Sequence, residues 1–378
     1  MKYYIIAGEA SGDLHGANLI KALRTLDPEA QIRFWGGDAM AALAGTPVRH
    51  IRDLAIMGFI EVIRHLPTVL SNIAHCKQDI AAWRPDALIG IDYPGFNLRI
   101  EGWAHKHGIR TIHYISPQLW AWKKGRLKGM RRNLDSLCYI LPFEQQFYAT
   151  NHMPQATYVG HPLIDAISQW NVDNKQQLAE NQLPTIALLP GSRRQEIQRS
   201  LPYMIRLARR HPEYNFSIAG LSILGENYYQ QILQRHNPPK NLTLLQDQTY
   251  QLLSQSYAAV VCSGTATLET ALFNVPQVVC YRANPITIAL ARALVGRRIN
   301  HIALVDLIDD SDLVIELLQN DFNDQRLEQE FQLITTDQQN RRRILDGYQR
   351  VRQQLGSDNA SLRTAQTIIQ IISHNQTK

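Results

Sequence analysis

The sequence contains no apolar run of the roughly eighteen residues that a membrane-spanning helix needs. It opens directly on a strand-like segment, so we expect neither a transmembrane span nor a cleavable leader, and a cytoplasmic location. The 4 cysteines form no C-x-x-C pair, which argues against a zinc knuckle and against a disulfide framework. We therefore expect buried free thiols.

The patterns of common cofactor sites are also missing. The loop Gly8–Asp13 contains glycines without the G-x-G-x-x-G spacing, which disfavours a nicotinamide enzyme. None of the 13 histidines pairs at i, i+4 beside a carboxylate, as a zinc site would favour. The segment Asp310–Asp312 matches an Asp-x-Asp metal motif. We interpret Ser311 or Asp312 instead as the N-cap of a helix over residues 313–319. We expect no metal and no cofactor.

Composition is otherwise ordinary. A chain of 378 residues with 45% hydrophobic content is long enough for two domains with separate cores. The net charge of +6 is a mild excess, compatible with phosphorylated substrates or an anionic membrane and too diffuse to indicate nucleic acid. We see no internal repeat and no low-complexity segment.

Short apolar runs alternate with amphipathic stretches through the chain, a pattern typical of doubly wound parallel sheets. In the first half we predict strands at residues 3–7, 32–34, 88–91, 111–115, 137–141 and 157–159. In the second half we predict strands at residues 185–189, 216–219, 242–245, 258–262, 277–281 and 301–305, followed by helices only. The predicted fold is α/β, with two Rossmann-like domains facing across a cleft.

The domain boundaries are predicted from composition. The polar stretch from Ser168 to Pro184 indicates a linker. We predict a first domain over 1–167, a second over 184–350, and a helical segment over 351–378. In that segment an apolar stripe predicts a helix that packs back on the first domain. The stripe consists of Leu362, Ala365, Ile369 and Ile372.

The stretch Leu88–Asn97 combines a short buried strand, an acidic residue and a Pro-Gly turn. A carboxylate after a parallel strand lies where open α/β sheets bind ligands, and Pro94 is expected to hold Tyr93 extended. We predict that Asp92 is a general base and that Asn97 caps the following helix. An Asx hydrogen bond that merely closes the turn is the alternative at Asp92. Two interpretations also stay open for the loop Gly8–Asp13: it contacts substrate, or it is a tight turn in which Asp13 caps the helix.

Two glycine-bearing loops of the second half follow strands and enter helices. The loop Pro190–Glu196 offers N–H groups, a hydroxyl and a guanidinium, a combination that suits a diphosphate. In the loop Ser263–Glu269 the final carboxylate lies about one turn inside a helix, where it can accept both hydroxyls of a ribose. Arg193 and Arg282 can neutralise a leaving diphosphate. Ordinary N-capping explains either loop alone, whereas the two together favour a nucleotide-diphosphate site.

Seven sequence blocks, spread over nearly the whole chain, carry a resemblance. They are Gly8–Asp13, Met57–Val62, Ile91–Asn97, Tyr114–Trp122, Gly160–Leu163, Leu189–Arg193 and Ser263–Glu269. In this order they resemble the lipid-A-disaccharide synthase family, glycosyltransferases of the B-fold type. The chain departs from the family pattern at Asp306, where that pattern has Asn.

The resemblance implies inverting transfer of 2,3-diacylglucosamine from its UDP derivative to 2,3-diacylglucosamine 1-phosphate, in the lipid A biosynthesis of a Gram-negative bacterium. It implies a catalytic role for Asp92. A UDP-sugar 2-epimerase and a non-enzymatic nucleotide-sugar binding protein stay open as alternatives. The implied acceptor contacts are Glu9, Ser11, Asp13, Met57, Phe59 and Asn97, and the implied UDP contacts are Gly191, Ser192, Arg193, Ser263, Gly264, Thr265, Glu269, Arg282, Asp306, Glu316 and Gln319.

Two stretches of the first half, residues 52–65 and 120–132, mix apolar and basic side chains. On pattern alone they are ordinary core and a solvated helix face. The acylated substrates that the resemblance implies favour a lipid surface instead, with Met57 and Phe59 beside an acyl chain. We therefore expect peripheral binding to an anionic inner membrane; a homodimer stays open.

Overall fold

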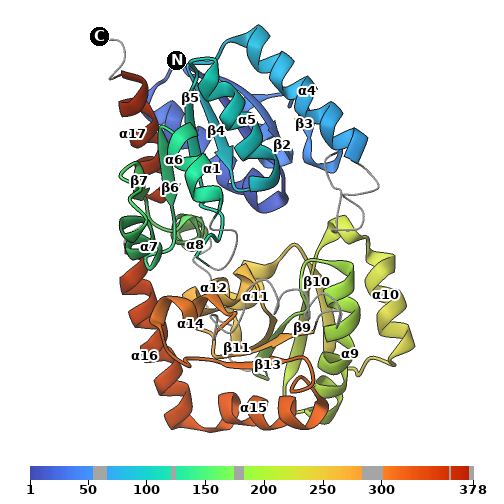
Figure 1. Cartoon of the computed structure of the whole chain (residues 1–378). Coiled ribbons are helices and arrows are strands. Elements are labelled where there is room, and N and C mark those ends of the chain that lie inside the picture. The colour runs from blue at the N-terminus through green and yellow to red at the C-terminus, as the bar shows by residue number, and fades with distance from the viewer. Residues whose placement is uncertain (54–65, 121–124, 174–182, 283–300, 357–358, 374–378) are drawn as a thin grey trace. The chain divides into compact units, whose positions relative to one another are not determined.

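The computed structural model describes residues 1–53, 66–120, 125–173, 183–282, 301–356 and 359–373 (Figure 1). The chain divides into two compact units, one formed by residues 1–165 with 357–378 and the other by residues 166–356. Each unit has its own parallel sheet with helices, so the predicted α/β class with two Rossmann-like domains is confirmed. Helix α8 (Pro162–Asp173) contains the boundary between the units.

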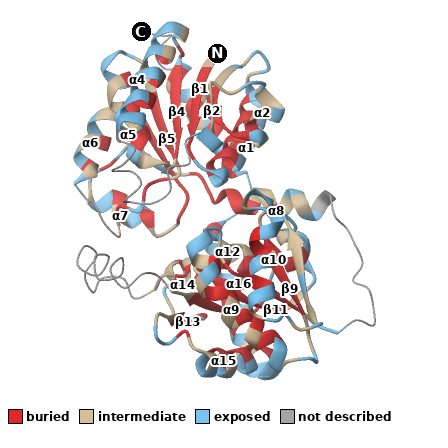
Figure 2. Cartoon of the chain, turned by 90° about the vertical axis from the view of Figure 1, so that its right-hand side faces the viewer, coloured by how far each residue is buried: buried red, intermediate tan, exposed pale blue. Residues whose placement is uncertain are grey.

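The first unit is built on a seven-stranded parallel sheet with the order β3-β2-β1-β4-β5-β6-β7. The central strands are short apolar runs and are buried, as expected for strands covered on both faces (Figure 2). The strands are β1 (Lys2–Ala7), β2 (Gln31–Gly36), β3 (Arg49–His50), β4 (Ala87–Ile91), β5 (Arg110–Tyr114), β6 (Ser136–Tyr139) and β7 (Ala156–Tyr158).

The helices of the first unit cover this sheet with their apolar faces. Under α5 and α4, Trp35 packs against Phe96, and Tyr4 and Ile100 belong to the same cluster. The helices are α1 (Ala10–Leu26), α2 (Asp38–Ala44), α4 (Leu66–Trp83), α5 (Pro94–Lys106), α6 (Arg126–Asn133), α7 (Glu144–Thr150) and α17 (Ala360–Ser373), with a short 3-10 turn, η1 (Ile51–Asp53).

The second unit has a six-stranded parallel sheet with the order β10-β9-β8-β11-β12-β13. Its strands are β8 (Thr185–Leu189), β9 (Asn215–Gly220), β10 (Leu242–Gln246), β11 (Ser256–Cys262), β12 (Gln277–Tyr281) and β13 (Ile315–Leu318). Its helical segments are α9 (Arg194–Arg210), η2 (Ser222–Leu224), α10 (Glu226–Arg235), α11 (Thr249–Ser254), α12 (Thr265–Leu272), α14 (Leu304–Asp309), α15 (Asp324–Thr336) and α16 (Gln338–Leu355). The 4 cysteines are buried free thiols, as predicted.

Two predicted elements of the second unit are wrong. Residues 301–305 are not a strand, because α14 begins at Leu304, and residues 313–319 are not a helix, because they contain the edge strand β13. The predicted N-cap at Ser311 or Asp312 is therefore wrong as well. The run Val314–Leu318 has apolar spacing that suits either element, and pairing with β12 makes it a strand.

Helix α17 packs on α1 within the first unit. Its buried face is centred on Thr364 and Ile368, whereas two members of the predicted stripe, Leu362 and Ile369, are only half-buried. Asp165 accepts hydrogen bonds from the first N–H groups of the helix, including that of Ser361 at 3.0 Å. In the part of the chain that the structure describes, no helix is long and apolar enough to cross a membrane.

Candidate functional site

Asp92 follows β4 directly, and its backbone leaves the strand in the left-handed region. Asp92 has φ 44° and Tyr93 has φ 48°, which costs non-glycine residues about 1–3 kcal/mol each. The Asp92 N–H donates to the Tyr114 carbonyl at 2.9 Å. The Tyr93 ring packs so closely on Gly8 that a Cβ there would lie 2.4 Å from the ring. The prediction that Tyr93 is extended is wrong, because Tyr93 is the N-cap residue of α5 in a left-handed conformation, with φ 48° and ψ 50°.

Asn97 does not cap α5, contrary to the prediction. The helix begins at Pro94, so Asn97 lies inside it and is fully buried. Its side-chain amide donates toward the carbonyl oxygens of Ile6 at 3.3 Å, Ile91 at 3.3 Å and Asp92 at 2.7 Å. One side chain thus joins the ends of β1 and β4 and holds the backbone of Asp92.

The Asp92 carboxyl is half-buried, and this burial raises its pKa above the ordinary value. The charge of His113 opposes the rise, the negative charge of Glu9 adds to it, and the Tyr93 N–H lowers the pKa again. A carboxyl whose pKa is moved toward neutral pH is a better proton acceptor in catalysis than an ordinary one.

The start of α1, from its N-cap Glu9 onward, holds three predicted acceptor residues. Glu9 and Ser11 are exposed at the start of α1. Asp13 is buried, and its carboxylate accepts hydrogen bonds from the N–H groups of Gly37 at 2.6 Å and Ala39 at 2.9 Å, at the start of α2. The Asp13 carboxylate is therefore engaged by backbone, whereas the polar side chains of Glu9 and Ser11 are exposed to solvent.

The structure describes only part of the two segments that we predicted to face lipid, residues 52–65 and 120–132. Met57 and Phe59 lie outside the described residues, as do Lys123 and Lys124. Helix α6 is described: it buries Leu127 and Met130 in an apolar cluster. Its basic residues Lys128, Arg131 and Arg132 are exposed. The helix thus has an anchored apolar face and a basic outer face.

In the second unit, the loop after β8 folds around a carboxylate. Gly191 has φ 113°, and a Cβ there would lie 2.8 Å from the Cβ of Glu196. Glu196 Oε2 accepts the N–H groups of Ser192 and Arg193, both at 3.2 Å, and the exposed Arg193 guanidinium lies 3.4 Å from Oε1. Converging backbone N–H groups of this kind make an anion site, and here the anion is the chain's own Glu196.

The loop after β11 leads into α12, with Ser263 and Gly264 before the helix and Thr265 as its first residue. Glu269 lies within α12, and burial raises the pKa of its carboxyl. The Tyr250 hydroxyl donates to Glu269 Oε1 at 3.3 Å and lowers that pKa. The sequence pattern did not indicate Tyr250, because the two residues are 19 positions apart and only the sheet brings α11 to α12.

Arg282 and Gln319 follow the neighbouring strands β12 and β13, and the Gln319 N–H donates to the Tyr281 carbonyl at 2.9 Å. The Arg282 guanidinium donates to the Tyr203 hydroxyl on α9. It lies 5.4 Å from the centroid of the same ring, and Arg206 lies 4.4 Å from it. Two guanidinium groups, those of Arg206 and Arg282, therefore lie against the ring of Tyr203. Tyr203 belongs to α9, the helix that follows the Gly191 loop.

Asp306, Glu316 and His301 place their side chains within 4.8 Å of one another. The Glu316 carboxylate accepts the Ile302 N–H at 2.9 Å, and Asp306 Oδ1 accepts the Leu313 N–H at 3.0 Å. Burial raises the pKa of Asp306 to about 7, and the charge of Glu316 also raises it. By residue type the three side chains suit a divalent cation, a grouping that the sequence did not indicate because β13 was not foreseen.

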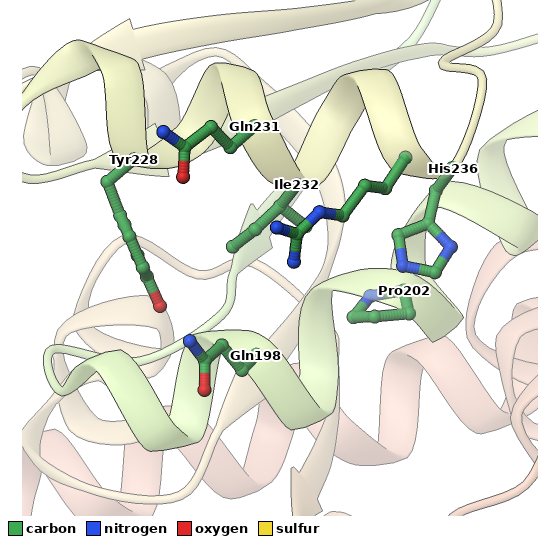
Figure 3. Close-up of a pocket in the computed structure, with 7 residues that line it drawn as sticks. Gln198, Pro202, Tyr228, Gln231, Ile232 and His236 are labelled. Carbon is green, nitrogen blue, oxygen red and sulfur yellow. The ribbon is translucent and has the colours of Figure 1, made fainter.

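A surface pocket lies between α9 and α10, where the Tyr228 ring extends from α10 toward Gln198 on α9 (Figure 3). None of the predicted site residues lines it. Its lining consists of Gln198, Pro202, Tyr228, Gln231, Ile232, Arg235 and His236.

Comparison with solved structures shows the fold. The UDP-GlcNAc 2-epimerase of Neisseria meningitidis, solved with UDP-GlcNAc, superimposes with a TM-score of 0.63 at 15% identity, covering 98% of this chain and 100% of that one. MurG of Acinetobacter baumannii superimposes with a TM-score of 0.57 at 15% identity, covering 98% and 99%. The architecture is that of the B-type glycosyltransferases.

Comparison of sequences identifies the family. The model of the lipid-A-disaccharide synthetase family matches residues 3–372. The lipid-A-disaccharide synthase of Syntrophus aciditrophicus is 35% identical over 378 residues, which cover 97% of each chain. The chain therefore belongs to the lipid-A-disaccharide synthetase family and is a glycosyltransferase of lipid A biosynthesis.

Proposed function

We propose that this protein transfers 2,3-diacylglucosamine from its UDP derivative to 2,3-diacylglucosamine 1-phosphate. The products are the β-1,6-linked tetraacyl disaccharide 1-phosphate and UDP, and the configuration at the donor sugar carbon inverts. Family membership supports the reaction class, and the carboxylate of Asp92, fixed in a left-handed turn at the end of β4, carries the mechanism.

Asp92 acts as the general base. The 6-hydroxyl of the acceptor forms a bond to C1 of the donor sugar while the bond from C1 to the UDP oxygen breaks, and the hydroxyl proton passes to the Asp92 carboxylate. An uncharged hydroxyl is a poor nucleophile at neutral pH, so a positioned base contributes on the order of a hundredfold or more in rate. The burial that raises the pKa of Asp92 improves it for this role.

The second unit binds UDP. Negative charge develops on the diphosphate as the sugar leaves, and the N–H groups of Ser192 and Arg193, together with the Arg193 guanidinium, are donors of the right kind. Glu196 accepts the same N–H groups, so binding of the diphosphate requires its carboxylate to release them. Glu269 accepts the ribose hydroxyls. The chemistry requires no metal and no cofactor.

The acylated substrates reside in a membrane, so the enzyme must work at its cytoplasmic surface. The apolar face of α6 is buried in the protein core, and its exposed basic residues support peripheral, electrostatic binding to anionic lipid. Glu9 and Ser11 are the acceptor contacts that the described first unit supports best, because both are exposed at the start of α1, whereas the Asp13 carboxylate is occupied by backbone donors.

The test is product analysis. Purified protein is incubated with the UDP-linked diacyl sugar, with and without the acceptor, and the products are followed by mass spectrometry. We expect UDP and the tetraacyl disaccharide phosphate only when both substrates are present, and no product from unacylated UDP-GlcNAc. Conversion of the donor to its C2 epimer without acceptor would instead establish an epimerase, and no turnover of any kind would leave a binding protein.

A further inference from the structure

A buried histidine–glutamate pair lies beside β4, the strand that leads into Asp92. His113 on β5 and Glu101 on α5 approach with 2.7 Å between Nδ1 and Oε1, and their side chains are 0% and 1% exposed. Removing two charges from water costs more than their attraction commonly returns, so apolar residues of similar size would serve stability as well. The pair therefore needs an explanation other than stability.

The fold places this pair and Asp92 around one glycine. Gly90 is the register partner of His113, and a Cβ on Gly90 would lie 2.2 Å from Glu101 Oε1. Asn97 and Glu101 are four residues apart and therefore share one face of α5. From that face Asn97 holds the Asp92 carbonyl at 2.7 Å, while Glu101 holds His113. One helix face thus fixes both the backbone of Asp92 and the imidazole.

The charges of the three side chains act on one another. Burial lowers the pKa of His113, but the charge and hydrogen bond of Glu101 and the charge of Asp92 outweigh burial, so the pKa is raised; Arg126 on α6 opposes them. In return, the charge of His113 lowers the pKa of Asp92, against burial and Glu9. Among the described residues, His113 Nε2 and Glu101 Oε2 have no hydrogen-bond partner.

We propose that Glu101 and His113 are positioning residues for the base: Glu101 keeps His113 protonated, and the charged imidazole keeps the Asp92 carboxylate ionised and ready to accept a proton. The inference rests on the proposed role of Asp92, and it adds a second layer to the site. Neither residue contacts the reacting atoms; each acts through the carboxylate.

The first experiment requires no activity. The intact protein is labelled with ¹⁵N-histidine, and the imidazole shifts are followed against pH in the parent and in Asp92→Asn. We expect His113 to titrate above the ordinary histidine pKa, and Asp92→Asn to lower its pKa by roughly one unit, because an opposite charge is lost. A His113 pKa that does not respond to Asp92→Asn overturns the proposal, whether or not Asp92 proves to be catalytic.

The second experiment is the pH–rate profile of kcat in Glu101→Gln, which leaves a neutral imidazole. Without the positive charge the Asp92 carboxyl protonates more readily, so we expect the acid limb to move to higher pH by roughly one unit. His107→Gln is the control, since His107 is an exposed histidine at the end of α5; its acid limb should stay in place. An unmoved acid limb in folded Glu101→Gln overturns the proposal.

Glu101→Gln removes the charged partner of a fully buried imidazole and can unfold the protein, so the pair is also removed together. Glu101→Gln with His113→Gln keeps hydrogen-bonding side chains and leaves no unpaired charge. The acid limb of this double variant should match that of Glu101→Gln. If Asp92→Asn retains its turnover, the proposed base fails instead, and the labelled-histidine titration alone then decides whether the three residues are coupled.

Discussion

Asp92 is held more tightly than a turn residue requires. Its N–H and its carbonyl are both hydrogen-bonded, and its φ of 44° is maintained by the packing of its neighbours. Replacement by Asn keeps this shape and removes the proton acceptor. We expect Asp92→Asn to reduce kcat by on the order of a hundredfold or more while the affinity for UDP is unchanged.

Steady-state kinetics and calorimetric titration with UDP measure the two quantities on the same preparation. Near-parental turnover across the pH range would make Asp92 a turn cap and exclude the proposed mechanism.

Glu144 is a second unusual carboxyl of the first unit. It is the first residue of α7 and 1% exposed, Oε2 accepts the Leu141 N–H at 3.2 Å, and burial raises its pKa to about 8. With the folded pKa above the unfolded value of 4.5, stability is fully present below pH 4.5 and is lost as pH rises toward 8. The loss is about 1.4 kcal/mol per pH unit.

We therefore expect Glu144→Gln to raise the free energy of unfolding at pH 8 and to change it little at pH 4.5, because Gln is neutral at both. Denaturant unfolding at the two pH values measures the difference. Glu226→Gln is the matched control, since Glu226 is also the first residue of its helix but is exposed. An equal effect of Glu144→Gln at both pH values would show that folding does not raise the pKa of Glu144.

At the scale of elements, the two loops that open α9 and α12 present their groups differently. Arg193 is exposed at the N-cap of α9, whereas Glu269 is held by Tyr250 inside α12. We expect Arg193→Ala and Glu269→Ala each to weaken UDP binding roughly tenfold or more, since hydrogen bonds to charged groups contribute about 1.5–3 kcal/mol. Isothermal titration with UDP gives both affinities.

The neighbouring Arg194 provides the control for the first change. Its guanidinium lies 4.7 Å from the centroid of the Tyr228 ring, away from the Gly191 loop contacts. Arg194→Ala should therefore retain UDP affinity. Unchanged affinity in both Arg193→Ala and Glu269→Ala would remove the nucleotide site from these loops.

At the scale of the whole molecule, none of the described helices can span a membrane, yet the proposed function requires the protein to reach acylated substrates. We expect salt-sensitive binding to vesicles that contain anionic lipid. Lys128→Gln with Arg132→Gln should weaken that binding roughly thirtyfold at low salt, because each basic residue near an anionic leaflet contributes about 1 kcal/mol. Vesicle sedimentation at two salt concentrations measures it.

The matched control removes two charges from the other unit. Arg235 and Lys240 are exposed there, and Arg235→Gln with Lys240→Gln lowers the net charge by the same amount. Equal loss in both double variants would mean that net charge, and not α6, determines binding.

Much of the architecture could be predicted from local sequence. Buried parallel strands are short apolar runs, and β1, β4, β8 and β11 are each followed by glycine or proline within three residues, so their predicted bounds lie close to the observed ones. The position of Asp92 at a strand end and the loops at Gly191 and Ser263 followed from the same pattern. These features depend on neighbours along the chain.

Sequence alone thus determined the α/β class and which loops follow which strands, because periodicity and turn residues act over a few positions. Tertiary structure alone decided whether 315–318 is a strand, since an ambiguous apolar run takes the state that its sheet edge offers. It also decided the role of Asn97 and the pairing of Glu101 with His113. Those contacts exist only because folding brings α5 over β4 and β5, and the burial and charges met there shift the pKa values of Asp92 and His113.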